Sequence, residues 1–184
     1  RRGLLMAAGV PAGDRLDEQW VAAWRSRGWG ASATGVGTVL ALFEVHRLLT
    51  NRIDRVLRPV GLTLARFEVL TLLLHADGQP LHVSGLASAL QVHATSVSSA
   101  LDRLEADDLV GREQDPADHR RILVRLTACG REQAHRASAL VRTQVLANLG
   151  LSDDATATLL RVLGSMRANA GDFVPAVSPR ARSA

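Results

Sequence analysis

The sequence predicts a mainly α-helical protein with one small β-hairpin, which places it in the α+β class. Apolar residues recur at helical spacing along most of the chain. They alternate with polar residues in one place, at Ile122, Val124 and Leu126, as in a strand with one buried face. With 184 residues, of which 47% are hydrophobic, the chain is long enough for one domain with a sizeable core.

Two helices are expected before residue 61. The first covers 14–27, where Leu16, Trp20 and Trp24 recur at every fourth position. The second covers about 36–60 and ends near Pro59 and Gly61. Its apolar stripe consists of Val39, Leu42, His46, Leu49, Ile53 and Val56. The segment 28–37 is rich in Gly, Ser and Thr, so it is expected to be a loop or linker.

Three helices are expected next, and the last of them has two distinct faces. A helix over 63–74 begins with a Thr63 cap. A short helix and its turn then pack through Leu86, Ala87, Leu90 and Val92. The following helix places Val97, Leu101 and Leu104 on one face. Its opposite face is small and polar, with Thr95, Ser99 and Asp102 flanked by Ser98 and Arg103.

A hairpin and two helices complete the expected elements. The strand at 122–126 is expected to pair with 109–112, across a loop too long for a two-residue hairpin. Thr127 is expected to cap a helix that runs to about residue 149. The motif Leu151-Ser152-Asp153-Asp154 begins the last helix, whose early acidic residues favour the positive end of the helix dipole. The residues expected to face inward are Leu159, Val162, Leu163 and Met166.

Composition restricts the function classes. All 22 basic residues are arginine and the formal charge is +4, which suits phosphate binding, although a GC-rich genome also produces arginine excess. The single cysteine, Cys129, excludes an internal disulfide, is expected to be structural, and indicates a reducing cytoplasm. The uncharged run 28–43 is shorter than a membrane span. No common hydrolase, zinc-protease or phosphate-loop motif is present, so we expect neither an enzyme nor a cofactor or metal.

The order of short helix, turn, Ser/Thr-faced helix and arginine-tipped hairpin resembles winged helix-turn-helix regulators of the multiple antibiotic resistance (MarR) type. Asp118-His119-Arg120, followed after five residues by Leu126-Thr127, matches the D-x-R and L-T wing signature of that family. The resemblance covers about 36–169. It departs from the family at Asp108, where glycine is usual, and at Ser99, where a basic residue is frequent.

The resemblance implies a domain plan. Residues 1–13 would be a flexible leader, 14–30 an N-terminal helix and linker, and 172–184 a flexible tail. The MarR-like domain would cover 31–171, with a winged helix-turn-helix at about 61–126 and dimerisation helices at about 36–60 and 127–170. The implied function is a cytoplasmic homodimeric repressor of a pseudo-palindromic operator, relieved by a small anionic or aromatic ligand. The alternative is a ligand-binding or protein-interaction module of this fold with weak or no specific DNA binding.

Candidate contacts to double-stranded DNA lie on the Ser/Thr-faced helix and the wing. Small hydroxyls let a helix approach base edges, although such residues also cap helices. Arg103 is better placed for a phosphate, and Arg120 is expected in a narrow minor groove. Asp118 is expected to orient a wing arginine, the alternative being a solvated charge cluster. The full set is His93, Thr95, Ser96, Ser98, Ser99, Arg103, Asp118, Arg120 and Arg121.

Candidate effector-binding residues follow from the resemblance to ligand-responsive members. They are Trp20, His46, Arg66, Phe67 and Glu68. His46 has an alternative role as a packed interface histidine. Urate is not expected as the ligand, because Glu68 and Ser99 stand where urate-responsive members place an aspartate and an arginine.

Overall fold

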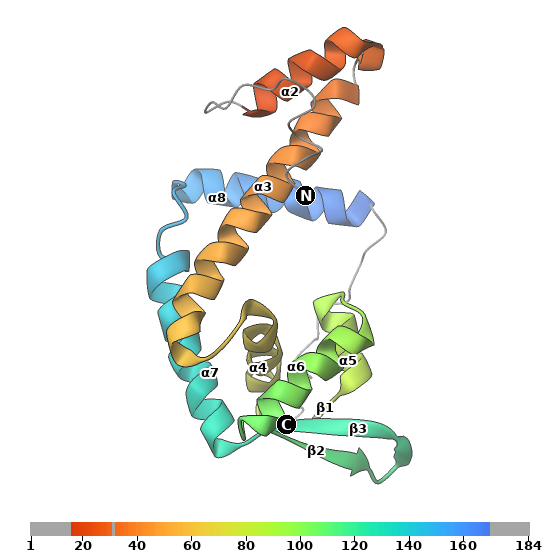
Figure 1. The fold of residues 1–184 in the computed structure, drawn as a ribbon, viewed down its shortest axis with the longest axis vertical. Helices are drawn as coiled ribbons and strands as arrows, with labels where there is room; N and C mark the ends of the chain where they lie inside the picture. Colours follow the sequence, from red (N-terminus) through yellow and green to blue (C-terminus); the bar gives the residue numbers. More distant parts are fainter. Residues whose placement is uncertain (1–15, 31, 170–184) are drawn as a thin grey trace, which may run out of the picture. The chain divides into compact units, whose positions relative to one another are not determined.

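The computed structural model describes residues 16–30 and 32–169, and Figure 1 shows the order of their helices and strands. The predicted leader at 1–13 and tail at 172–184 lie outside these residues. The chain forms two compact units that divide within one long helix, between Ile53 and Asp54. The predicted winged region, about 61–126, falls wholly within the second unit.

The first unit consists of helical segments. Helix α2 covers Leu16–Trp24 and continues as a π-helical turn, η1, over Arg25–Trp29. Within that unit the rings of Trp24 and Trp29 meet edge to face, with their centroids 4.5 Å apart. The next helix, α3, covers Ser32–Leu57 and crosses the unit boundary.

The loop predicted over 28–37 is wrong from Ser32 onward. Helix α3 already begins there, because an isolated glycine is tolerated in a helix at modest cost. Thr34, which lies in the predicted loop, accepts a hydrogen bond at its backbone carbonyl from the Thr38 hydroxyl at 3.0 Å, one helix turn further along. The predicted break is reduced to the turn that contains Gly28 and Gly30, both with positive φ.

The second unit places three short helices around an apolar core. After the 3₁₀ turn η2 (Arg58–Val60) come α4 (Leu64–His75), α5 (Val83–Leu90) and α6 (Ala94–Ala106). Thr63 caps α4 as predicted, its hydroxyl accepting from the Arg66 N–H at 3.4 Å. The fully buried large side chains here are Leu57, Val69, Leu70, Leu86, Val97, Leu101, Leu104, Val124 and Val145. The prediction that Val92 packs inward in the turn after α5 is wrong, because 43% of this residue is exposed.

A three-stranded antiparallel sheet forms the wing. Strand β2 (Val110–Asp115) and strand β3 (Asp118–Leu126) pair along their length, and the two-residue β1 (Leu81–His82) pairs with the other edge of β3. The expectation of a long hairpin loop is wrong. Pairing continues past Arg112 to Asp115, with a register shift after Gln114, so only Pro116 and Ala117 join the strands. The Asp115 carboxylate accepts the Ala117 N–H at 2.8 Å and stabilises this turn.

Two helices follow the wing. Helix α7 covers Ala128–Val141, continues as the π-helical turn η3 (Arg142–Leu146), and is followed by α8 (Asp153–Asn169). The helix predicted to reach residue 149 therefore ends earlier. Gly150 is in a left-handed conformation, and its N–H donates to the Asn148 side chain at 3.0 Å, which closes the connecting turn.

Helix α8 leaves most of its large apolar side chains exposed. None of its residues is buried, and the four expected to face inward are half-buried or exposed. Helix α3, likewise, leaves Val39, Phe43, Val45 and Leu48 exposed. Among the described residues, no helix is both long and apolar enough to cross a lipid bilayer.

Candidate nucleic-acid interface

Helix α6 presents a polar face of small side chains, and its N-cap residue fixes the first turn of the helix. His93 is the N-cap, and its Nδ1 accepts the Thr95 N–H at 3.3 Å and lies 2.8 Å from the Thr95 hydroxyl oxygen. The unprotonated Nδ1 satisfies the geometry of both contacts. Thr95, Ser96 and Ser99 are exposed, whereas Ser98 is half-buried. The structure thus gives His93 a capping role that sequence reasoning did not assign.

The end of α6 confirms that Asp108 can replace the usual glycine. Asp108 has a φ of 56°, in the left-handed region. The Leu109 N–H donates to the Leu104 carbonyl at 2.8 Å, and the Asp108 N–H donates to the Glu105 carbonyl at 3.0 Å. These two bonds form a Schellman cap, which ends the helix and directs the chain into β2.

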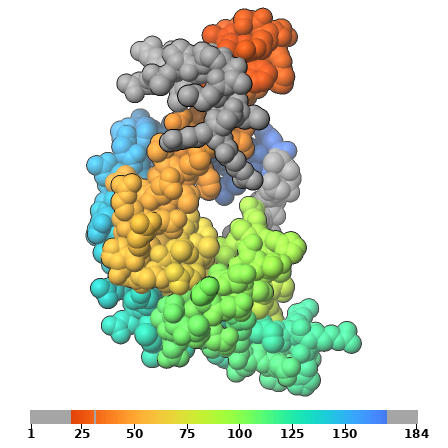
Figure 2. Space-filling view, in the orientation of Figure 1, coloured from red at the N-terminus to blue at the C-terminus, as the bar shows by residue number. Residues whose placement is uncertain are grey.

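The wing carries arginines oriented by one carboxylate. One oxygen of Asp118 accepts the Arg120 N–H at 3.1 Å, and the other lies 3.3 Å from Nε of Arg121. Asp118 therefore orders the Arg121 guanidinium and the Arg120 backbone. The Arg120 side chain is exposed, and the hairpin projects beyond the helices of its unit in the space-filling view (Figure 2).

A basic groove connects the wing with α5 and α6. Its volume is about 380 Å³, and it brings Ser98 of α6 together with Arg120 and Arg121 of β3. Three further polar residues that sequence reasoning missed, His82, Ser84 and Arg112, line the same groove, with Val83, Ala94 and Ile122. Three arginines therefore line one concave surface, and guanidinium groups are suited to phosphate recognition. Two of them are already paired within the chain, Arg112 with Asp102 and Arg121 with Asp118.

Arg112 has structural contacts of its own. Its Nη2 donates to the Asp102 carboxylate of α6 at 2.7 Å. The sequence offered one signal: Arg112 lies two residues after the buried Val110 and thus on the same face of β2. Arg103 is exposed at the edge of the α6 polar face, where it was expected.

Comparison with known proteins identifies the family. Residues 60–121 match the profile of the MarR family. A repressor of Mycobacterium tuberculosis, Rv2887, is 34% identical over 111 residues, which cover 59% of this chain and 78% of the relative. The chain belongs to the MarR family. The uncharacterised regulator YdgJ of Bacillus subtilis is 35% identical over 112 residues, 59% of this chain and 66% of that protein.

Solved MarR-type structures agree with the fold. Sco5413 from Streptomyces coelicolor, a MarR family regulator, superposes with a TM-score of 0.69 at 28% identity, over 76% of this chain and 96% of that one. The transcriptional repressor CouR, whose structure was solved in complex with a 23-mer DNA duplex, superposes with a TM-score of 0.63 at 30% identity. The match covers 68% of this chain and 89% of that one. The fold class and the resemblance stated from the wing signature are thereby confirmed.

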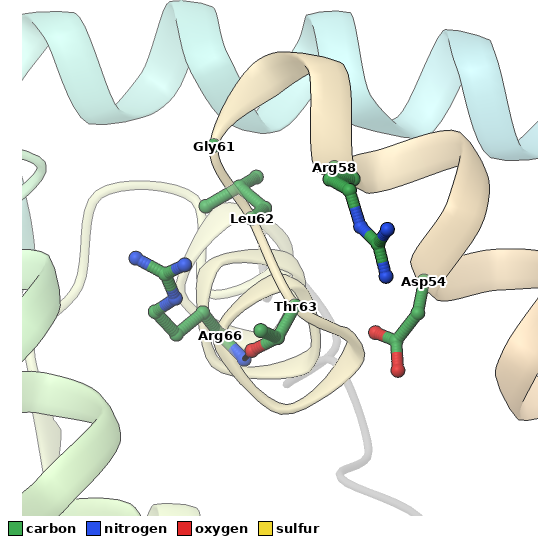
Figure 3. Close-up of a pocket in the computed structure, with 6 residues that line it drawn as sticks. All are labelled: Asp54, Arg58, Gly61, Leu62, Thr63 and Arg66. Carbon is green, nitrogen blue, oxygen red and sulfur yellow. Dashed lines mark hydrogen bonds between the residues drawn. The ribbon is translucent and has the colours of Figure 1, made fainter.

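This MarR-family chain has a second cavity in the same unit, between η2 and the start of α4. It measures about 280 Å³ and is lined by Asp54, Arg58, Gly61, Leu62, Thr63 and Arg66 (Figure 3). The Asp54 carboxylate accepts the Leu64 N–H at 2.7 Å, so it helps to fix the first turn of α4. Nη1 of Arg66 lies 3.2 Å from the Asp107 carboxylate at the end of α6.

The candidate effector residues are distributed over both units. Trp20 and His46 belong to the first unit, where Trp20 is half-buried and His46 is exposed. Arg66, Phe67 and Glu68 belong to the second, and of these Arg66 lines the 280 Å³ cavity. Consecutive helix positions point in different directions, which explains why Phe67 and Glu68 do not line it.

Proposed function

We propose that this protein is a sequence-specific DNA-binding transcriptional regulator, a repressor that acts as a homodimer. The observation that carries the proposal is the basic groove, in which Ser98 of α6 lies together with Arg120 and Arg121 of the wing. Its relatives support the proposal, since Rv2887 is a transcriptional repressor and the structure of CouR was solved in complex with a DNA duplex.

The residues of the two elements would divide the work of recognition. Helix α6 enters the major groove, where the hydroxyls of Ser96 and Ser99 can donate to or accept from base edges. Arg120 enters the adjacent minor groove, whose negative potential attracts a guanidinium. Arg103 and Arg121 neutralise phosphates, which positions the domain without reading sequence.

A second copy of the chain would complete the regulator. The exposed apolar side chains of α3 and of α8 are the surfaces on which we base the dimer. A two-fold dimer reads a pseudo-palindrome with half-sites about one helical turn, ~34–36 Å, apart. The proposal places the protein in the cytoplasm with the DNA and assigns it no catalytic step.

Relief of repression by a small ligand belongs to the same proposal. The cavity beside Arg66 is the candidate site in the second unit, and Arg58 and Arg66 favour an anionic group there. Such a ligand releases DNA only if it binds the non-DNA conformation more tightly, and tenfold release needs about 1.4 kcal/mol of differential affinity.

The decisive experiment measures DNA binding by fluorescence anisotropy at a fixed moderate salt concentration. The probe is the DNA upstream of the protein's own gene, with unrelated DNA as competitor. We expect Arg120→Ala to weaken operator binding by about 1–3 kcal/mol. Arg125→Ala removes a guanidinium from the same strand, where it is paired with Glu113, and should change binding much less. Equal affinity for operator and unrelated DNA would instead favour a ligand-binding or protein-interaction module.

The ligand site needs its own test. A panel of aromatic acids, phenols and aliphatic carboxylates is added to the preformed complex, and release of DNA is followed. We expect an active compound to lose its effect on Arg58→Gln, because one guanidinium that lines the cavity is gone. A compound that releases DNA equally from the variant would exclude this cavity as its site.

A further inference from the structure

Negative charge gathers in the C-terminal half of α6 and at its C-cap residue, Asp107. Asp102, Glu105 and Asp107 lie within six residues, and all three are exposed. Free carboxylates here would be repelled by DNA phosphates, which form a dense line of negative charge. The structure shows that each has an arginine from another element beside it.

Arg112 of β2 contacts two of the three. Its Nη2 lies 2.7 Å from Asp102 Oδ1, and its Nε lies 3.3 Å from Glu105 Oε2 without the orientation of a hydrogen bond. Asp102 and Glu105 are three residues apart, so they share one face of the helix. The Arg112 side chain is 23% exposed, so its charge is less screened than that of an ordinary surface arginine.

Arg66 of α4 contacts the third. Its Nη1 lies 3.2 Å from Asp107 Oδ2, and its side chain is 20% exposed. Asp107 caps the end of α6, where its N–H donates to the Arg103 carbonyl. Two arginines from different elements therefore hold the helix end beside the left-handed turn at Asp108.

We propose that Arg112 is a positioning residue for DNA reading, with Arg66 supporting it from α4. Arg112 acts through Asp102 and Glu105. It neutralises these two carboxylates, which would otherwise repel DNA phosphates at the helix that carries Ser98. This inference rests on the proposed function and deepens it, because it assigns Arg112 to the protein's own helix rather than to a DNA phosphate.

The test is a double-mutant cycle in operator affinity. Arg112→Gln should weaken operator binding about tenfold, a size typical of residues within one network. Neutralising the partners together, Asp102→Asn with Glu105→Gln, should change binding less than about threefold in the otherwise unchanged protein. The same pair of substitutions added to Arg112→Gln should recover most of the lost affinity.

Two outcomes would overturn the proposal. One is additivity, meaning that neutralising the carboxylates changes affinity by the same factor with and without Arg112. The other is a weaker salt dependence of DNA binding for Arg112→Gln, with the slope of log affinity against log salt shallower by about 0.9, and no recovery when the carboxylates are neutralised. That result marks a lost phosphate contact. If Arg112→Gln does not fold, the same cycle is measured on Arg112→Met, which keeps an unbranched side chain but removes the charge.

Arg125→Gln is the matched control. Arg125 pairs with Glu113 at 2.8 Å across the two wing strands, and both side chains are about half exposed. Its removal, with or without Glu113→Gln, should show no coupling in DNA affinity, because this ion pair joins the two wing strands rather than the wing and α6. If the unchanged protein binds no operator selectively, the proposed function fails together with this inference. If it binds and the cycle is additive, only the inference fails.

Discussion

The side-chain hydroxyl of Thr127 donates a hydrogen bond to the backbone carbonyl of Asp108 at 2.7 Å. The same oxygen accepts the Gly130 N–H at 2.9 Å and so caps α7. One threonine therefore links the turn that ends α6 to the start of α7. This contact gives the L-T part of the wing signature a physical reason.

Replacing Thr127 with Val should remove both bonds while keeping the branched shape. We expect a loss of about 1–2 kcal/mol in the free energy of unfolding, which is typical of a lost helix cap. Urea denaturation followed by circular dichroism measures it. Thr127→Ser keeps the hydroxyl and should retain most of the stability. A valine variant as stable as the unchanged protein would contradict the capping role.

Gly130 should tolerate no side chain. A Cβ built there overlaps the Leu109 carbonyl, because the first turn of α7 packs against that backbone. Gly130→Ala should lower the thermal midpoint through a loss of about 1–3 kcal/mol, the usual cost of overpacking. Gly85→Ala is the control, since a Cβ there meets nothing within 4 Å. Equal thermal midpoints for the two variants would show that the Leu109 backbone shifts without cost.

Asp108→Gly should stabilise the protein, unlike most substitutions. Glycine adopts the left-handed conformation without the steric cost that a Cβ imposes. We expect a gain of about 0.5–1 kcal/mol in unfolding free energy, seen as a higher thermal midpoint. Asp108→Ala keeps the Cβ and should bring no gain. An unchanged or lower midpoint for the glycine variant would mean that the aspartate side chain compensates for the strain.

Ser99 should affect sequence preference more than overall affinity. It is exposed on the polar face of α6, and a hydroxyl can discriminate among base edges. Ser99→Ala, and Thr95→Ala beside it, should change the ranking of operator variants in competition assays. Ser88→Ala on α5 serves as the control for loss of an exposed hydroxyl. Uniform losses on every DNA sequence would assign Ser99 and Thr95 to phosphate contacts.

The proposed dimer should depend on the exposed apolar faces. Leu48 on α3 and Leu160 on α8 are 62% and 64% exposed. Replacing either with Glu places a charge in a buried interface, so it should shift the protein toward monomer in analytical ultracentrifugation. Val92→Glu changes an exposed residue in the turn before α6 and should leave the dimer intact. A monomeric unchanged protein would refute the dimer outright.

The sequence alone predicted the elements whose signals are local. The two faces of α6 follow from residue spacing, and Val97, Leu101 and Leu104 are buried as expected. Thr63 and Thr127 cap the helices that they were expected to cap, because a capping hydroxyl bonds within three residues. The family could also be assigned, since the D-x-R and L-T spacing is a local pattern.

Tertiary structure decided what depends on residues far apart in the chain. Strand β1 has two residues and no alternation, so only its pairing with β3 defines it. The two-residue hairpin turn follows from pairing that continues to Asp115, and the contacts of Arg112 and Arg66 join elements 10 and 41 residues apart. Spacing along one element predicts which residues share a face. It does not predict which other element that face meets, because each such contact depends on how the whole core packs.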